Sequence, residues 1–180
     1  YPVSRFVGML LLAYISWLVS SLGGSYTRTT ISVVFAVLAV AGISLGWMRR
    51  DELRVEWKSN RRYFLIVEGL FLAFFIFDLL IRFGNPDLWH PAKGGERPMD
   101  FSYFNAVLKS TSFPAYDPWF AGGYINYYYY GFVVVGTPVK LLGIVPSISY
   151  NLILPTLFAM VALGAFCVAW NLLDNGRQTN

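Results

Sequence analysis

The sequence predicts an all-α integral membrane protein with about five transmembrane helices. Hydrophobic residues make up 56% of the 180 residues and charged residues only 13%, which leaves too few polar side chains to cover a soluble domain. The apolar residues gather into runs of about 20, the length that a helix needs to cross a hydrocarbon core about 30 Å thick. A long polar stretch separates two of these runs, and there we expect a large extracytoplasmic loop.

Two apolar runs near the start predict a helical hairpin. Residues 6–22 form the first expected crossing and lead into the turn Gly23-Gly24-Ser25, and residues 30–48 form the second. The segment Arg49–Arg62 then holds six Lys or Arg among its fourteen residues, and these charges would cost several kcal/mol in hydrocarbon. We therefore expect this segment to be a loop in water, and the alternative is that it contacts anionic lipid headgroups.

Three further crossings follow the basic segment, at residues 63–81, 127–144 and 151–173. Pro138 and Pro155 lie inside the last two and predict kinks there. The outer loop, residues 83–126, contains five of the nine prolines and is too long to be a simple connection. This loop is therefore the expected place for a functional site.

The positive-inside rule sets the expected orientation in the cell membrane. The segment Arg49–Arg62 is the densest basic cluster and should remain cytoplasmic, so the loop 83–126 should be extracytoplasmic. By alternation, the Gly23 turn lies outside, the turn Val145–Ser147 and the nearby Lys140 lie inside, and the C-terminal tail lies outside.

We expect residues 1–180 to be a fragment of a larger polytopic membrane domain. The chain opens on Tyr1 instead of Met, and its first residues lack the charge pattern of a signal peptide. The rest of the full-length chain is then an expected partner. The net charge of +4 does not indicate nucleic acid, because most basic residues are gathered in one short segment.

A helix within the outer loop is predicted from Pro98 to Ser110. Proline suits a first helical turn, and apolar side chains recur at spacings of three and four. These apolar side chains are Phe101, Phe104, Val107 and Leu108. The opposite side carries Ser102, Asn105 and Lys109. An amphipathic helix of this kind beside a crossing is expected to lie in the membrane interface.

Three carboxylates in the loop predict either acid–base chemistry or a metal site. Asp100 lies in the first turn of the expected helix, where the helix dipole and unpaired amides favour its ionised form. Glu96 precedes Asp100 by four residues, and Asp117 follows in a tight turn that leads to Trp119. Such groups can activate a hydroxyl, and Asp100 and Asp117 can ligate Mg²⁺ or Mn²⁺. The alternative is that they only solvate the loop, and a lone His90 is expected to be structural.

Four consecutive tyrosines, Tyr127–Tyr130, stand where the loop returns to the membrane. One interpretation is an aromatic belt at the interface. The other is that phenol rings stack on a sugar while their hydroxyls bind its oxygens or a phosphate. Because consecutive helical residues point in different directions, at most two of the four can share one pocket.

Two acids lie inside the third expected crossing and suggest an alternative function. Asp78 has Arg82 four residues later, so a local ion pair is expected. Glu68 has no such neighbour within a turn, although Arg61 or Arg62 could reach it. If Glu68 and Asp78 lined a polar path, the protein would be a transporter or flippase. A non-catalytic assembly subunit is a third possibility.

The tyrosine cluster resembles a known family signature. Tyr127-Tyr128-Tyr129-Tyr130-Gly131 resembles the YYYxG motif of the YYY-motif membrane proteins, often called the Chlor-Arch-YYY domain. Three other segments also resemble that family: Glu96-Arg97-Pro98-Met99-Asp100-Phe101, Asp117-Pro118-Trp119-Phe120-Ala121-Gly122-Gly123 and Tyr150-Asn151-Leu152. The family is poorly characterised, so its name implies no activity.

The layout of the chain is similar to that of the membrane-embedded glycosyltransferases of the GT-C superfamily. Those enzymes carry an acidic residue in a large outer loop, followed by an amphipathic helix beside the membrane. The resemblance implies that Asp100 deprotonates the acceptor hydroxyl and that Glu96 or Asp117 is a second acid or metal ligand. In the familiar enzymes the acidic loop follows the first helix, whereas here two further expected helices precede it.

We therefore predict inverting transfer of a sugar from a polyprenyl-phosphate donor in the bilayer to a hydroxyl or amide acceptor in water. Asp100 and Glu96 are the predicted catalytic residues, and Asp100 should point into an outward-facing cavity beside the tyrosines. The predicted substrate-binding residues are Arg97, Asp117, Trp119, Tyr127, Tyr128, Tyr129 and Tyr130. The expected partners are the lipid bilayer and a lipid-linked sugar.

Overall fold

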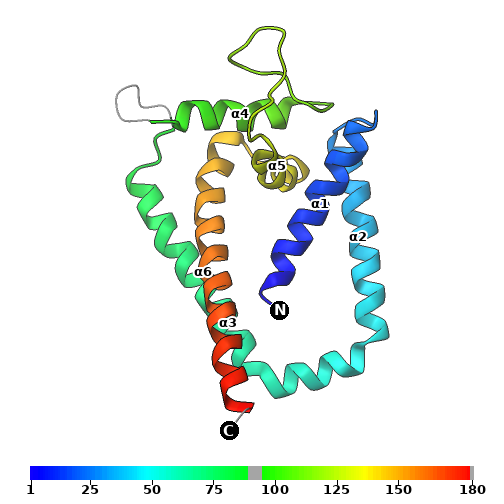
Figure 1. Ribbon diagram of the computed structural model, residues 1–180, viewed down its shortest axis with the longest axis vertical. Coiled ribbons are helices and arrows are strands. Elements are labelled where there is room, and N and C mark those ends of the chain that lie inside the picture. The colour runs from blue at the N-terminus through cyan, green and yellow to red at the C-terminus, as the bar shows by residue number, and fades with distance from the viewer. Residues whose placement is uncertain (89–94, 179–180) are drawn as a thin grey trace. The chain divides into compact units, whose positions relative to one another are not determined.

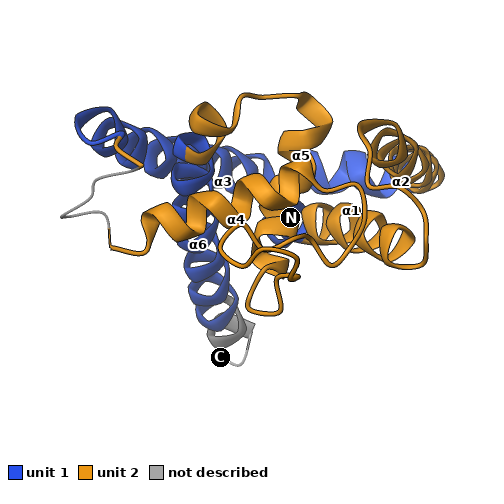
Figure 2. Ribbon diagram, turned by 90° about the horizontal axis from the view of Figure 1, so that it is seen from above, with its two compact units in different colours: residues 1–6, 49–86, 151–180 blue, residues 7–48, 87–150 orange. Residues whose placement is uncertain are grey.

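The computed structural model describes residues 1–88 and 95–178, and its regular elements in that part of the chain are six helices (Figure 1). They are α1 (Val3–Ser21), α2 (Arg28–Met48), α3 (Arg50–Gly84), α4 (Arg97–Lys109), α5 (Tyr130–Leu142) and α6 (Pro146–Gln178). His90 lies outside the described residues. The chain divides into two compact units (Figure 2). The first contains residues 1–6, 49–86 and 151–180, and the second contains residues 7–48 and 87–150.

By length and composition, four helices in the described part of the chain can cross a membrane: α1, α2, α3 and the Pro146–Leu173 part of α6. The prediction of an all-α membrane protein is thus confirmed, with four candidate crossings where about five were expected. The difference lies at residues 127–144, where α5 has only 13 residues. A helix of that length spans about 20 Å, which is less than a hydrocarbon core about 30 Å thick. Helix α5 ends at Gly143, whose left-handed φ of 71° suits glycine.

The first unit is built mainly from α3 and α6. Rings of α3 and α6 contact each other along both helices: Tyr63 contacts Trp170 with 5.1 Å between ring centroids, and Phe74 contacts Phe158 at 5.8 Å. Helix α3 begins directly after Arg49, so the basic segment expected to be a loop is helical. A break at Asn60, with φ −110° and ψ 22°, separates this basic part from the apolar part of α3.

The second unit places α4 and α5 crosswise to α1 and α2 (Figure 1). Helix α4 packs against α5, with the buried side chains of Phe104 and Val107 over Gly136. A Cβ at Gly136 would meet Val107 Cγ1 at 3.5 Å, so this position has room for little more than a methyl group. The same core includes buried residues of α1, α2 and the loop: Leu12, Tyr26, Ile31, Val34, Ala115 and Ile125.

The turn between α1 and α2 lies against the loop that follows α4. The backbone N–H of Tyr26 donates to Thr111 O at 2.7 Å, and the Tyr26 hydroxyl is 2.9 Å from the Thr137 hydroxyl of α5. The ring of Tyr26 contacts Phe113 with 4.8 Å between centroids. The expectation that this turn and the loop share one side of the membrane agrees with these contacts.

The junction between α5 and α6 lies close to the start of α2 and to α4, whereas residues 145–147 were expected on the other side of the membrane from the loop. At Gly143, a Cβ would be only 3.4 Å from Nη1 of Arg28, at the start of α2. Tyr150 contacts Phe101 of α4 with 5.6 Å between ring centroids. Lys140, expected in the cytoplasm, donates to Ser110 O at 2.6 Å. The alternation counted residues 127–144 as a full crossing, and α5 is shorter than that.

Candidate functional site

Helix α4 positions the predicted acids. Pro98 lies in its first turn, and the backbone N–H of Asp100 donates to Glu96 O at 2.9 Å. The buried face of α4 carries Tyr103, Phe104 and Val107. Asp100 stands three and seven residues before Tyr103 and Val107, so it belongs to this inner face. The expected helix is present. Its inner face also includes Tyr103, which was not among the apolar residues that predicted the helix.

The Asp100 carboxyl lies beside Tyr128, which comes from the segment just before α5. Partial burial raises the pKa of Asp100, and the negative charge of Glu96 raises it further. The interaction with the Tyr128 hydroxyl lowers the pKa of Asp100 and only partly offsets the other two effects. Asp100 is therefore a carboxyl of increased basicity next to a phenol. The sequence analysis singled out Asp100 and Tyr128 separately, and the structure places them near each other.

The four tyrosines divide into an exposed pair and a packed pair. The side chains of Tyr127 and Tyr128 are 63% and 45% exposed, and their rings contact each other with 4.1 Å between centroids. Tyr129 instead accepts a hydrogen bond from Trp17 Nε1 at 3.2 Å, and Tyr130 packs edge-on against the Trp17 ring. Tyr127 and Tyr128 are therefore exposed, whereas Tyr129 and Tyr130 pack against Trp17 of α1.

Asp117 shapes its own loop. Its Oδ1 accepts a hydrogen bond from the backbone N–H of Trp119 at 2.8 Å, and its own N–H donates to Gly123 O at 2.9 Å. The indole Nε1 of Trp119 donates to Ser102 Oγ at 2.7 Å, which fastens the loop to α4. Burial, followed by the charge of Asp117, raises the pKa of Tyr103. Asp117 thus lies near the inner face of α4, with a structural role of its own.

The described residues offer limited support for the predicted metal site. Across residues 1–88 and 95–178, no group of three His, Cys, Asp or Glu side chains could hold a metal ion. Ligation of Mg²⁺ or Mn²⁺ by Asp100 and Asp117 stays a prediction, resting on two carboxylates. Arg97 donates from Nη1 to Asp87 O at 3.3 Å, which holds its guanidinium near the start of α4.

A hollow of about 390 Å³ lies on the other face of α4. Its lining residues are Phe101, Ser102, Asn105, Ala106, Lys109 and Pro118. Asp100 does not line it, because that residue is on the opposite side of the helix. The cavity expected next to Asp100 and the tyrosines stays a prediction, and this separate hollow is formed by the opposite side of α4 and by Pro118.

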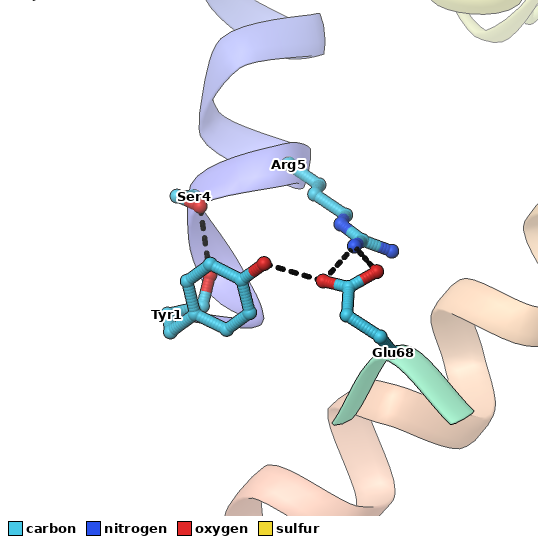
Figure 3. Close-up of polar contacts among 4 residues, drawn as sticks. All are labelled: Tyr1, Ser4, Arg5 and Glu68. Carbon is cyan, nitrogen blue, oxygen red and sulfur yellow. Dashed lines mark hydrogen bonds and ion pairs between the residues drawn. The ribbon is translucent and has the colours of Figure 1, made fainter. Parts of the chain in front are cut away.

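The intramembrane acid Glu68 has partners that no local spacing indicated. In the first unit, its carboxylate accepts hydrogen bonds from the Arg5 guanidinium and the Tyr1 hydroxyl (Figure 3). Arg61 and Arg62, which the sequence left as possible partners, do not form ion pairs with Glu68 in the described part of the chain. The Arg5 guanidinium also lies 4.6 Å from the ring centroid of Phe71.

Arg82 also differs from its expected pairing. Its Nε donates to Asn151 Oδ1 at 2.9 Å, and a second guanidinium N–H bonds to the same oxygen. Among the described residues, the predicted ion pair of Arg82 with Asp78 does not form. These contacts join α3 to α6, and a single sequence contains no signal for such pairings between distant helices.

Comparison with known proteins gives one family. The model of a family described as "Uncharacterized membrane protein (DUF2298)" matches residues 11–179, which is nearly the whole chain. The comparisons with curated proteins and with solved structures give no match. The family match therefore supports the membrane assignment and assigns no activity.

Proposed function

The chain belongs to DUF2298, a family of uncharacterized membrane proteins, and we propose that within it this protein is a membrane glycosyltransferase. The proposal is that a sugar passes from a polyprenyl-phosphate donor in the bilayer to an acceptor at the extracytoplasmic face. One observation carries the proposal: the Asp100 carboxyl lies beside Tyr128 on the inner face of α4. The resemblance of Tyr127–Tyr130 to the YYY motif, and of the layout to GT-C enzymes, supports it.

Four crossings give the proposed topology. The basic segment Arg49–Arg62 is cytoplasmic by the positive-inside rule, so α3 and α6 meet the outer surface at Gly84 and Pro146. The α1–α2 turn and everything between α3 and α6 then lie outside. This agrees with the hydrogen bonds that join Tyr26 to Thr111 and Thr137. In this topology the C-terminal end of α6 is cytoplasmic.

The chemistry follows from the basicity of Asp100. Its carboxylate accepts the proton of an acceptor hydroxyl, and the acceptor oxygen forms a bond to the anomeric carbon of the sugar. The bond between that carbon and the phosphate oxygen breaks, and the polyprenyl phosphate leaves with the electron pair. Positioned general bases typically contribute about 10²- to 10⁴-fold to rate.

The other residues have supporting roles in the proposal. The exposed rings of Tyr127 and Tyr128 offer stacking surfaces for a sugar beside Asp100. Arg97 stands within one turn of Asp100 and supplies positive charge for the leaving phosphate, a kind of stabilisation often worth about 3 to 4 kcal/mol in enzyme sites. Mg²⁺ or Mn²⁺ at Asp100 and Asp117 is an additional proposal. Glu96 keeps the Asp100 carboxyl basic through its charge.

Asp100→Asn in the full-length protein tests the proposal directly. Transfer to a hydroxyl acceptor is measured with radiolabelled polyprenyl-phosphate mannose and polyprenyl-phosphate glucose as donors. We expect turnover to fall at least about 100-fold, because the amide cannot take up the proton. The matched control is Asp51→Asn, which removes a carboxylate from the exposed basic segment and should leave turnover unchanged. Equal turnover in Asp100→Asn and the wild type would exclude Asp100 as the base.

A further inference from the structure

The basic part of α3 is a short helix tied at both ends to membrane-crossing helices. It runs from Arg50 to the break at Asn60 and begins one residue after α2 ends. Arg49 has φ −107° and ψ 21°, close to the −110° and 22° of Asn60, so similar breaks bound the helix on each side. Because no loop separates this helix from either crossing, it stays at the membrane surface.

One stripe of this helix combines arginines with apolar side chains. Arg50, Leu53, Arg54 and Trp57 follow the spacing i, i+3, i+4, i+7 and therefore share one face. The Trp57 ring stacks on Phe64, beyond the break, with 5.1 Å between centroids. Phe64 belongs to the apolar part of α3, so this contact places Trp57 of the stripe against that crossing.

Two sides of the helix differ in charge. Glu52 and Glu56, four residues apart, lie on the side away from the stripe. The segment Arg49–Arg62 as a whole carries six Lys or Arg against three Asp or Glu. The contacts of Asp51 with Arg54 at 3.4 Å and with Arg50 at 4.0 Å are highly exposed, and ion pairs of this kind contribute little in water.

We propose that this stripe binds the headgroups of anionic phospholipids. Guanidinium groups pair with phosphate through two parallel hydrogen bonds, and arginine is therefore suited to a phospholipid surface. Trp57 and Leu53, each 50% exposed, lie in the interface next to these arginines. A loop surrounded by water would not need the Trp57–Phe64 stack, nor the placement of Glu52 and Glu56 away from the stripe. The inference is independent of the proposed enzymatic activity.

Lipid retention by the full chain tests this inference. The protein in detergent is equilibrated with equal amounts of phosphatidylglycerol and phosphatidylcholine, and the bound lipids are counted by native mass spectrometry. We expect the wild type to prefer phosphatidylglycerol. In Arg50→Gln/Arg54→Gln the preference should fall by about fivefold for each arginine removed. The matched control, Glu52→Gln/Glu56→Gln, changes as many charges on the other side and should keep or increase the preference.

A second measurement avoids any variant that fails to fold. Raising the ionic strength shortens the range of charge interactions, so the preference of the wild type for phosphatidylglycerol should decrease in concentrated ammonium acetate. A wild type that retains both lipids equally would overturn the proposal. So would an unchanged preference in the double arginine variant.

Discussion

Two carboxylates of this protein each have a tyrosine near them, and their surroundings are otherwise opposite. Glu68, inside α3, is also bonded to the Arg5 guanidinium, which compensates its charge (Figure 3). Asp100, at the start of α4, has the negative Glu96 near it, and its pKa is raised by burial and by that charge. A carboxylate with a cation partner stabilises structure, whereas one that is partly desolvated beside another acid is prepared to take up a proton.

Of the variants that test this difference between Asp100 and Glu68, Tyr128→Phe is expected to have the largest effect. This variant removes the hydroxyl that lowers the pKa of Asp100, so that pKa should rise and the acid limb of the pH–rate profile should move to higher pH. We expect turnover near neutral pH to fall about fivefold, the usual net value of one hydrogen bond. Measured profiles of transfer against pH check this prediction.

Tyr129→Phe is the matched control for Tyr128→Phe. The Tyr129 hydroxyl accepts a hydrogen bond from Trp17 Nε1 and is not among the groups that shift the pKa of Asp100, so its loss should leave the pH profile in place. If both variants shifted the pH profile equally, the Tyr128 hydroxyl could not be the group that lowers the pKa of Asp100.

A smaller effect, on stability, is expected when Glu68 loses its partner Arg5. Arg5→Gln leaves Glu68 without its cation partner and should lower the free energy of unfolding by about 1 kcal/mol, as for other polar contacts between membrane helices. Chemical unfolding in mixed micelles measures the change. The double variant Arg5→Gln/Glu68→Gln should lose less than the sum of the two single variants, because the two side chains interact. Strict additivity would show that the pair contributes nothing.

The smallest effect is the pH dependence of stability at Asp100. Because its pKa is raised in the folded protein, the folded state binds this proton more tightly than the unfolded state. The resulting stabilisation is present below the ordinary Asp pKa of about 4 and is lost as the pH rises through the folded value. Asp100→Asn should therefore gain stability over the wild type as the pH is raised from 4 to about 7. Thermal unfolding midpoints across that range measure the difference, and a difference that shrinks with pH would contradict the raised pKa.

Local patterns in the sequence were sufficient for much of this architecture. Apolar runs located α1, α2, the apolar part of α3 and α6, because a crossing is defined by its own length and composition. Pro98 and the spacing of Phe104 and Val107 located α4 for a similar reason. The fourth run was misjudged because tyrosines and apolar residues continue from 127 to 144, although the helix itself extends only from Tyr130 to Leu142.

Contacts between distant segments were beyond those patterns. The Arg5–Glu68 pair joins residues 63 positions apart, and no spacing rule relates two different helices. Asp100 and Tyr128 were both singled out, yet their meeting depends on how α4 is rotated on α5. That rotation depends on side-chain packing between the two helices, such as that of Phe104 and Val107 over Gly136, for which a single sequence contains no signal.

The burial of Tyr26 has a practical consequence for any attempt to isolate the outer loop. This residue belongs to the first hairpin, yet its backbone and hydroxyl bond to Thr111 and Thr137, and burial raises its pKa to about 12. The hairpin is therefore a scaffold for the segment that carries Asp100, even though it contributes no acid to it. A water-soluble excerpt of the loop, prepared as an antigen or for crystallisation, would leave this tyrosine behind and lose the template on which the loop takes its shape.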